Sequence, residues 1–176
     1  MVLEPLVQGA GGMRMCRPQF LSAVQALLQE HDVLAIYDEV LTGFGRTGEL
    51  FACAKAATQP DIICLAKGLT GGFLPLAATV CSDRIFDAFY SDDSGKAFYH
   101  GHSYTANPLG CAAALASLEL LAEGRFRPLA AWQCEEVERL RGHGRLGRAR
   151  ACGTIAAVDV LVEGDEGYLH QVGLQL

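Results

Sequence analysis

The stretch DIICLAKGLTGG, residues 61–72, decides how the whole chain is interpreted. Its apolar run, Ile62–Ala66, has the length of a strand and ends at Lys67, and three of the next five residues are glycine. A second uninterrupted apolar run, Val33–Tyr37, ends as abruptly at Asp38. Strands that are apolar throughout are typical of parallel sheets covered on both faces, and ligands bind beyond the carboxyl ends of such strands. We therefore predict an α/β domain with Asp38 and Lys67 at its functional edge.

The remaining elements are predicted from apolar spacing, prolines and glycines. Strands are expected at Val2–Val7, Val33–Tyr37, Ile62–Leu65, Leu76–Cys81 and Ile155–Val162, and helices at 18–28, 83–89, 109–121 and 128–141. The sequences TGFGRTG and HGHSYTANP are expected to be loops. The basic cluster from Arg139 to Arg150 is interpreted as a solvated helix end.

Composition excludes several classes of protein. The 176 residues suffice for one domain with a sizeable core, and a net charge of −6 offers no broad basic surface for nucleic acid. No apolar stretch approaches the roughly 20 residues that span a bilayer, and the N-terminus lacks the pattern of a signal peptide. The seven cysteines are odd in number and include no CxxC pair, which indicates reduced thiols. We expect a cytoplasmic protein without membrane or nucleic-acid partners.

Asp38 and Lys67 allow two interpretations. They could form a structural salt bridge. Alternatively, a lysine in surroundings of low dielectric favours its neutral amine, which is a nucleophile able to form a Schiff base with a carbonyl compound. Pyridoxal phosphate uses such a lysine and needs an acid beside its ring nitrogen, so the pair supplies both parts. The His100 and His102 pair has no third ligand in view, and no metal site is predicted.

Three motifs in order favour the cofactor interpretation. IYDEVLTGFGRTG, DIICLAKGLTGG and HGHSYTANPLGCAAA resemble successive signatures of the class III aminotransferases, which are fold-type I pyridoxal-phosphate enzymes. The resemblance implies part of the large domain, a mainly parallel sheet with helices on both faces. It divides the chain into a cofactor-binding portion (1–122), a helical connection (123–152) and the start of the small C-terminal domain (153–176). The family's upstream phosphate loop and most of its small domain are not recognised, so we expect a fragment.

The resemblance also implies roles for residues of the first two motifs. Lys67 matches the lysine that holds the cofactor, contacts substrate and moves the proton during transfer. Asp38 matches the partner of the ring nitrogen, and Val40 the apolar residue that packs on the ring face, although Val40 suits a core position in any case. Glu39 and Arg46 are given no catalytic role.

The third motif implies a homodimer. Ser103 stands where the family often has a threonine whose hydroxyl reaches the cofactor phosphate across the dimer interface, and His102 adjoins it as a cofactor-binding loop residue. Gly101 matches a position near bound substrate. The plainer alternative for Ser103 is that it ends a turn.

Within the family, two features are similar to the branch that serves biotin synthesis. They are the segment EPLVQGAGGM, which has Ala10 where other branches carry an acid, and Leu41, where other branches carry glutamine. LTGGFLPLAATV points to the same branch. It moves an amino group from S-adenosylmethionine, or in some relatives lysine, to 8-amino-7-oxononanoate, giving 7,8-diaminononanoate. Two alternatives stay open, namely a class III aminotransferase for another ω-amino acid or diamine, and a non-catalytic degenerate fragment.

Overall fold

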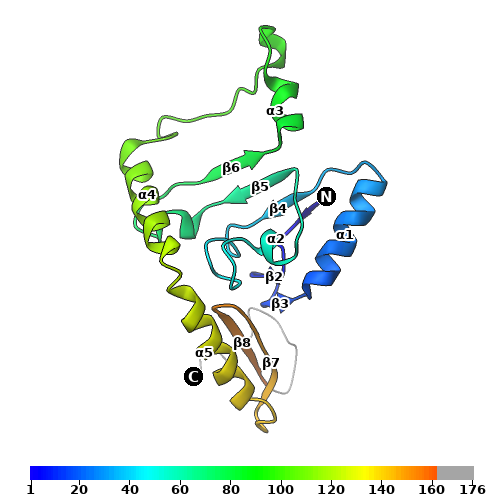
Figure 1. Ribbon diagram of the computed structural model, residues 1–176, viewed down its shortest axis with the longest axis vertical. Coiled ribbons are helices and arrows are strands. Elements are labelled where there is room, and N and C mark those ends of the chain that lie inside the picture. Colours follow the sequence, from blue (N-terminus) through cyan, green and yellow to red (C-terminus); the bar gives the residue numbers. More distant parts are fainter. Residues whose placement is uncertain (162–176) are drawn as a thin grey trace.

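A four-stranded mixed sheet forms the centre of the computed structural model, which describes residues 1–161 (Figure 1). Strands β1 (Val2–Leu3), β4 (Ile36–Asp38) and β5 (Ile62–Leu65) run parallel, and β6 (Ala78–Cys81) pairs with β5 in the antiparallel direction. The strand order is β1-β4-β5-β6. The predicted α/β class with a mainly parallel sheet is confirmed.

The prediction of one strand over Val2–Val7 is wrong. β1 ends at Leu3, and β2 (Val7–Gln8) leaves the sheet to pair antiparallel with β3 (Arg14–Met15). The chain turns between the two strands because Leu6 adopts a φ of 63°, and the preceding Pro5 has no N–H to donate to a neighbouring strand. The turn between β2 and β3 is the glycine-rich segment Gly9–Met13.

Most predicted helices are present. They are α1 (Pro18–Glu30), α3 (Asp83–Phe89), α4 (Pro108–Ala122) and α5 (Phe126–Arg139), with a short α2 (Ala52–Lys55) and the 3-10 turns η1 (Lys67–Thr70) and η2 (Ser94–Lys96) in addition. The side chain of Asn107 caps α4 by accepting a 2.7 Å hydrogen bond from the N–H of Gly110. Within residues 1–161, no helix has the length and apolarity to cross a membrane.

An antiparallel hairpin follows α5. Its strands are β7 (Leu146–Cys152) and β8 (Ile155–Val160). The interpretation of Arg139–Arg150 as a solvated helix end is confirmed for Arg139 and Arg141, which are exposed at the end of α5, and is wrong for most of the cluster's second half, which lies in β7. The expected boundaries at residues 122 and 152 remain predictions. The connection 123–152 is helical only in part, and the end of the predicted strand Ile155–Val162 lies outside the described residues.

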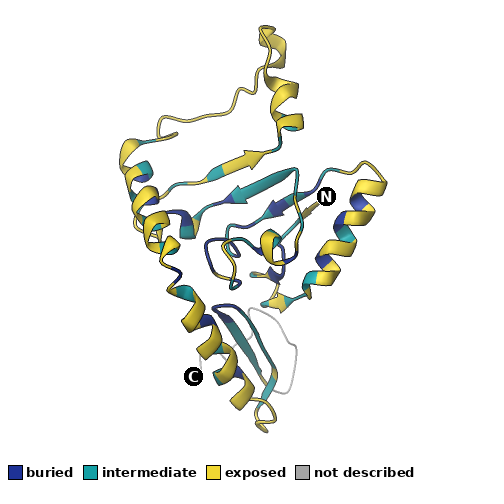
Figure 2. Cartoon of the chain, in the orientation of Figure 1, coloured by how far each residue is buried: buried dark blue, intermediate teal, exposed yellow. Residues whose placement is uncertain are grey.

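Two apolar cores hold these elements. The larger joins α1, β4, α2 and the hairpin around the fully buried Tyr37, and the smaller joins β5, η1 and α4 around Phe44, Leu65, Leu69 and Ala114. Gln25 of α1 completes the first core, since its side chain accepts a 3.1 Å hydrogen bond from the Tyr37 hydroxyl. By contrast, α3 and the segment before α4 are exposed (Figure 2).

Candidate active site

Asp38 and Lys67 leave the sheet at the same edge. Strands β4 and β5 are parallel neighbours with Asp38 opposite Cys64, and Lys67 stands two residues beyond the end of β5 at Leu65. The sequence-based placement of the two residues is thus confirmed, whereas their roles stay predictions. Across residues 1–161, no ion pair joins the two side chains, so the plain salt-bridge interpretation is not what the structure shows.

The Asp38 carboxylate is half-buried and only partly used. Its Oδ1 accepts a 3.0 Å hydrogen bond from the N–H of Val40, which fixes the direction of the side chain. Its second oxygen has no partner among the described residues. Asp38 therefore offers a held, negatively charged acceptor at the edge of the sheet.

Lys67 combines an anchored backbone with an exposed side chain. It adopts a φ of 45°, a left-handed conformation that costs a non-glycine residue roughly 1–2 kcal/mol. The packing after it maintains this conformation. A Cβ on Gly68 would lie 2.8 Å from the Cβ of Phe44, and the carbonyl oxygen of Gly68 accepts a 3.0 Å hydrogen bond from the Ser117 hydroxyl of α4. The backbone from which the Lys67 side chain extends is thereby held in place.

Glu39 organises the loop that follows Asp38. It is fully buried, and its two carboxylate oxygens accept hydrogen bonds from the N–H groups of Ala52 and Cys53, both 2.8 Å, and from the Thr42 hydroxyl, 3.1 Å. The carboxylate thus caps the short helix α2. Asp38 and Val40, on either side of the fully buried Glu39 in the sequence, are only half-buried. From the sequence, we gave Glu39 no catalytic role, and we did not predict that it caps α2.

Gly101, His102 and Ser103 do not join Asp38 and Lys67 within this chain. They are exposed, in a segment that passes outside the sheet on the β6 side (Figure 1). The contacts of His102 are local, since its Nδ1 accepts from the N–H of Tyr104 and its own N–H donates to the Thr105 hydroxyl. Hydrogen bonds from residues 98–106 to more distant parts of residues 1–161 are absent.

All seven cysteines are free thiols. Burial, reinforced by the Glu39 carboxylate, raises the pKa of Cys53 to about 12, and burial also raises the pKa of Cys16 and of Cys152. Cys81 and Cys134 are exposed. In the part of the chain that the structure describes, no group of three or more His, Cys, Asp or Glu side chains is arranged to hold a metal ion.

Comparison with known proteins decides the family. A model described as aminotransferase class III matches residues 1–172. The chain belongs to the class III aminotransferase family. The resemblance carried by the three sequence motifs is confirmed. Asp38 and Lys67, which the sequence motifs singled out, lie at one edge of the sheet, and their roles remain predictions.

Two bacterial family members named adenosylmethionine-8-amino-7-oxononanoate aminotransferase are similar over most of the chain. The Synechococcus elongatus protein is 56% identical over 99% of this chain, and the Geobacter sulfurreducens protein is 47% identical over 92%. The chain spans only 42% and 37% of these two relatives, respectively.

Solved family structures have the same fold. The enzyme of that name from Methanocaldococcus jannaschii superposes with a TM-score of 0.83 at 38% identity, covering 91% of this chain and 39% of that one. An (S)-enantioselective omega-transaminase from Thermomicrobium roseum gives the same TM-score and identity, covering 91% and 36%. A PLP-bound amine transaminase from an uncultivated Pseudomonas species matches at 33% identity with a TM-score of 0.83, covering 92% and 38%.

Proposed function

We propose that this chain carries the lysine and the aspartate of a pyridoxal-phosphate aminotransferase. The observation that carries the proposal is the shared sheet edge, where a half-buried carboxylate with a free oxygen and an exposed lysine on an anchored turn lie at the ends of adjacent parallel strands. When bound, the cofactor supplies an electron sink for breaking bonds at the carbon that bears the amino group.

The residues present fit this cofactor. The free oxygen of Asp38 would hold the proton of the ring nitrogen, because a negative charge beside that proton favours the cationic ring. Lys67 would hold the cofactor covalently and move the proton on substrate, and Val40 would pack on the ring face. The anchored backbone of η1 limits how far Lys67 can stray while its amine stays mobile.

We propose a second copy of the chain as partner. Ser103 and His102 would contact the cofactor of the opposite subunit, and Gly101 would lie near substrate. In support, the segment that carries them is exposed and bonded only locally, as expected of a segment whose contacts lie on a partner. Exposed aromatic residues on and next to the segment add apolar surface for that contact, namely Tyr90, Phe98, Tyr99 and Tyr104. The intact protein would act in the cytoplasm.

The proposed reaction is transfer of the amino group of S-adenosylmethionine to 8-amino-7-oxononanoate, giving 7,8-diaminononanoate for biotin. The names of the similar bacterial relatives support it. The second candidate is an ω-transaminase for another amine, favoured by the equal structural similarity to the Thermomicrobium roseum enzyme. Gly9 and Leu41, which lie in the segments typical of the biotin branch, are in contact. A Cβ on Gly9 would lie 2.6 Å from Cδ2 of Leu41.

Covalent capture tests the site in this chain directly. The chain is mixed with pyridoxal phosphate, reduced with borohydride, digested and mapped by mass spectrometry. We expect weak binding but selective labelling of Lys67, because the Nζ of Lys55 is held by the carbonyl oxygen of Thr47 at 2.6 Å and Lys96 lies outside the edge. Lys67→Ala should abolish the labelling and Lys96→Ala should not. Equal labelling of Lys67 and Lys96 would contradict a site.

The reaction itself is tested on the longest natural polypeptide that contains this chain, since the chain spans about two fifths of its relatives. Amino transfer to 8-amino-7-oxononanoate is measured with S-adenosylmethionine, lysine and simple ω-amines as donors. Preference for S-adenosylmethionine supports the first candidate. Turnover with ω-amines and pyruvate alone supports the second. We expect no measurable transfer by the 176-residue chain.

A further inference from the structure

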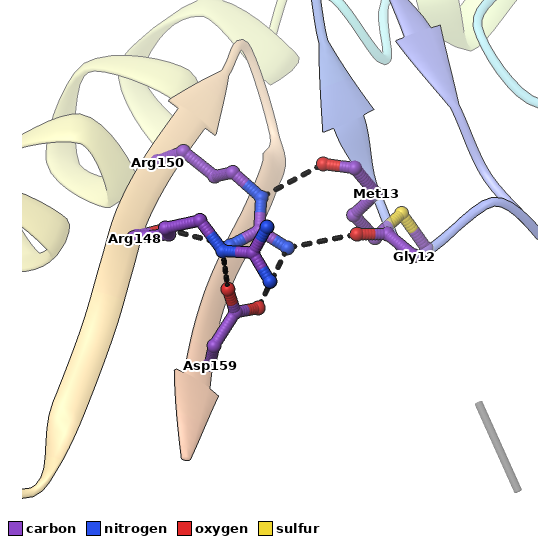
Figure 3. A network of polar contacts seen from close by, with 5 residues as sticks. All are labelled: Gly12, Met13, Arg148, Arg150 and Asp159. Atoms are coloured by element: carbon purple, nitrogen blue, oxygen red, sulfur yellow. Dashed lines mark hydrogen bonds and ion pairs between the residues drawn. The ribbon is translucent and has the colours of Figure 1, made fainter. Parts of the chain in front are cut away.

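The guanidinium of Arg150 joins two parts of the fold that are far apart in sequence (Figure 3). Its Nε donates to the carbonyl oxygen of Met13 and its Nη2 to that of Gly12, both at 2.8 Å. The same guanidinium pairs with Asp159 of β8 at 3.0 Å, and its Nη1 donates to the carbonyl oxygen of Arg148 at 2.6 Å. Arg150 therefore clamps the β7–β8 hairpin onto the turn between β2 and β3.

The clamped turn needs outside support. The N–H groups of Gly12 and Met13 both donate to the carbonyl oxygen of Gly9 at 3.2 Å, which closes the turn. Gly12 has a φ of 89°, which glycine tolerates, but Met13 has a φ of 52°, which disfavours a side chain. Charged hydrogen bonds to the two carbonyl oxygens oppose relaxation of this conformation. The guanidinium is itself held by Asp159, whose own burial acts to raise its pKa, while the bonds from Arg148 and Arg150 lower that pKa overall.

The Gly9–Met13 turn contacts the segment that carries the candidate site. Gly9 approaches the Leu41 side chain so closely that a Cβ would meet Cδ2 at 2.6 Å. Leu41 follows Val40, whose N–H donates to Asp38. Each link from the guanidinium to the carboxylate is thus a short contact or a step along the chain.

We infer that Arg150 is a positioning residue, which sets the Gly9–Met13 turn against Leu41 and thereby fixes the Asp38–Val40 segment. The effect of Arg150 on the turn and on residues 38–41 is inferred from the contacts alone. Its effect on catalysis rests on the proposed function. The alternative is that Arg150 only links the hairpin to the turn. It would stabilise the protein without moving residues 38–41.

The experiment compares Arg150→Met and Arg150→Lys with Arg141→Met in the longest natural polypeptide that contains the chain. Arg141 lines the same cleft of about 370 Å³ as Arg150 but pairs with Glu138 at the surface, so it controls for the loss of a guanidinium there. Amide hydrogen exchange is followed at Gly12, Met13 and Val40. The N–H of Cys111 in α4, bonded to the carbonyl oxygen of Asn107, is the internal reference.

We expect Arg150→Met to speed exchange at all three amides at least about tenfold, while exchange at Cys111, and exchange throughout the Arg141 variant, stays unchanged. Lysine, with a single ammonium group, should recover part of the protection. Cofactor dissociation constant, kcat and KM are then measured, and weaker cofactor binding with lower kcat is expected.

Two results would overturn the inference. Unchanged exchange at Gly12 and Met13 would mean that the turn does not need Arg150. Faster exchange there with an unchanged Val40 would mean that Arg150 only links the hairpin to the turn. Failure of the proposed function is a separate outcome, because the unaltered polypeptide would then bind no cofactor while the three amides could still respond to Arg150→Met.

Discussion

The hydroxyl of Ser117 donates a 3.0 Å hydrogen bond to the carbonyl oxygen of Gly68, so α4 holds the backbone directly after Lys67. Ser117→Ala removes this bond and should lower the free energy of unfolding by about 1 kcal/mol. The left-handed backbone of Lys67 should also relax, because one of its restraints is gone. Urea unfolding measures the first effect and borohydride capture of the cofactor the second. Ser117→Thr, which keeps the hydroxyl, is the control, and equal behaviour of the two variants would contradict the role.

Asp38→Asn separates charge from structure at the sheet edge. The amide oxygen can still accept from the N–H of Val40, so folding should be unaffected. A neutral amide cannot stabilise the proton on the cofactor ring by charge, so amino transfer in the longest natural polypeptide should fall at least about a hundredfold, in line with loss of a charged interaction worth ~3 kcal/mol. Near-normal turnover would make Asp38 a structural residue.

Glu39→Gln tests the buried cap of α2. The substitution turns one oxygen into an N–H₂ group that faces a backbone N–H, so at least one buried donor loses its acceptor. We expect a loss of about 1–3 kcal/mol in the free energy of unfolding, measured in urea. Glu49→Gln, at an exposed position of the same loop, should change stability by less than about 0.5 kcal/mol. Similar values for the two variants would remove Glu39 from the fold's essential contacts.

Cys53 should make stability fall at high pH. Its pKa is raised from 9.0 in the unfolded chain to about 12 by burial and by Glu39, so the folded state holds the thiol proton more tightly. This contribution is complete below pH 9 and is lost as the pH rises toward 12. Cys53→Ala should therefore flatten the pH dependence of the free energy of unfolding between pH 9 and pH 12, whereas Cys81→Ala, at an exposed site, should not. At pH 8, iodoacetamide should modify Cys81 and Cys134 before Cys53.

Ser103 should complement across the subunit boundary. In a mixed dimer of Lys67→Ala and Ser103→Ala subunits, one of the two sites regains both an intact lysine and an intact serine if Ser103 serves its neighbour. We expect mixed dimers to bind cofactor at half of their sites with normal affinity, whereas each variant alone binds weakly or not at all. Titration of cofactor absorbance measures both. No recovery in the mixed dimer would place Ser103 within its own subunit's site or outside any site.

The sequence predicted those helices and strands whose signals lie within a few neighbouring residues. Ile62–Leu65 is a strand and Asp83–Phe89 a helix with the bounds expected, because an apolar run and a Ser82-Asp83 start carry those signals within a few residues. Strand β7 was missed, although the alternation Arg148-Ala149-Arg150-Ala151 is a strand signal, because the density of arginines resembled a helix surface. The antiparallel direction of β6 depends on how the loop after Lys67 packs, which no local pattern encodes.

The candidate site likewise contains residues that a local pattern predicts and residues that it does not. Asp38 and Lys67 could be found because each follows an uninterrupted apolar run, and the structure places Asp38 at the end of β4 and Lys67 just beyond β5. The contact that holds the backbone after Lys67 in place acts over a long separation, 49 residues between Gly68 and Ser117. Such partners are fixed by packing rather than by spacing in the sequence, so they could not be predicted.

The clamp formed by Arg150 has a consequence for the order of folding. Its bond to Gly12 spans 138 residues, which is most of the described chain. On a ribosome that adds about 5–20 residues per second, the turn at Gly12 waits roughly 7–28 s for its arginine. During this interval Met13 can leave its left-handed conformation. We therefore expect the sheet edge with Asp38 and Lys67 to form before the clamp closes.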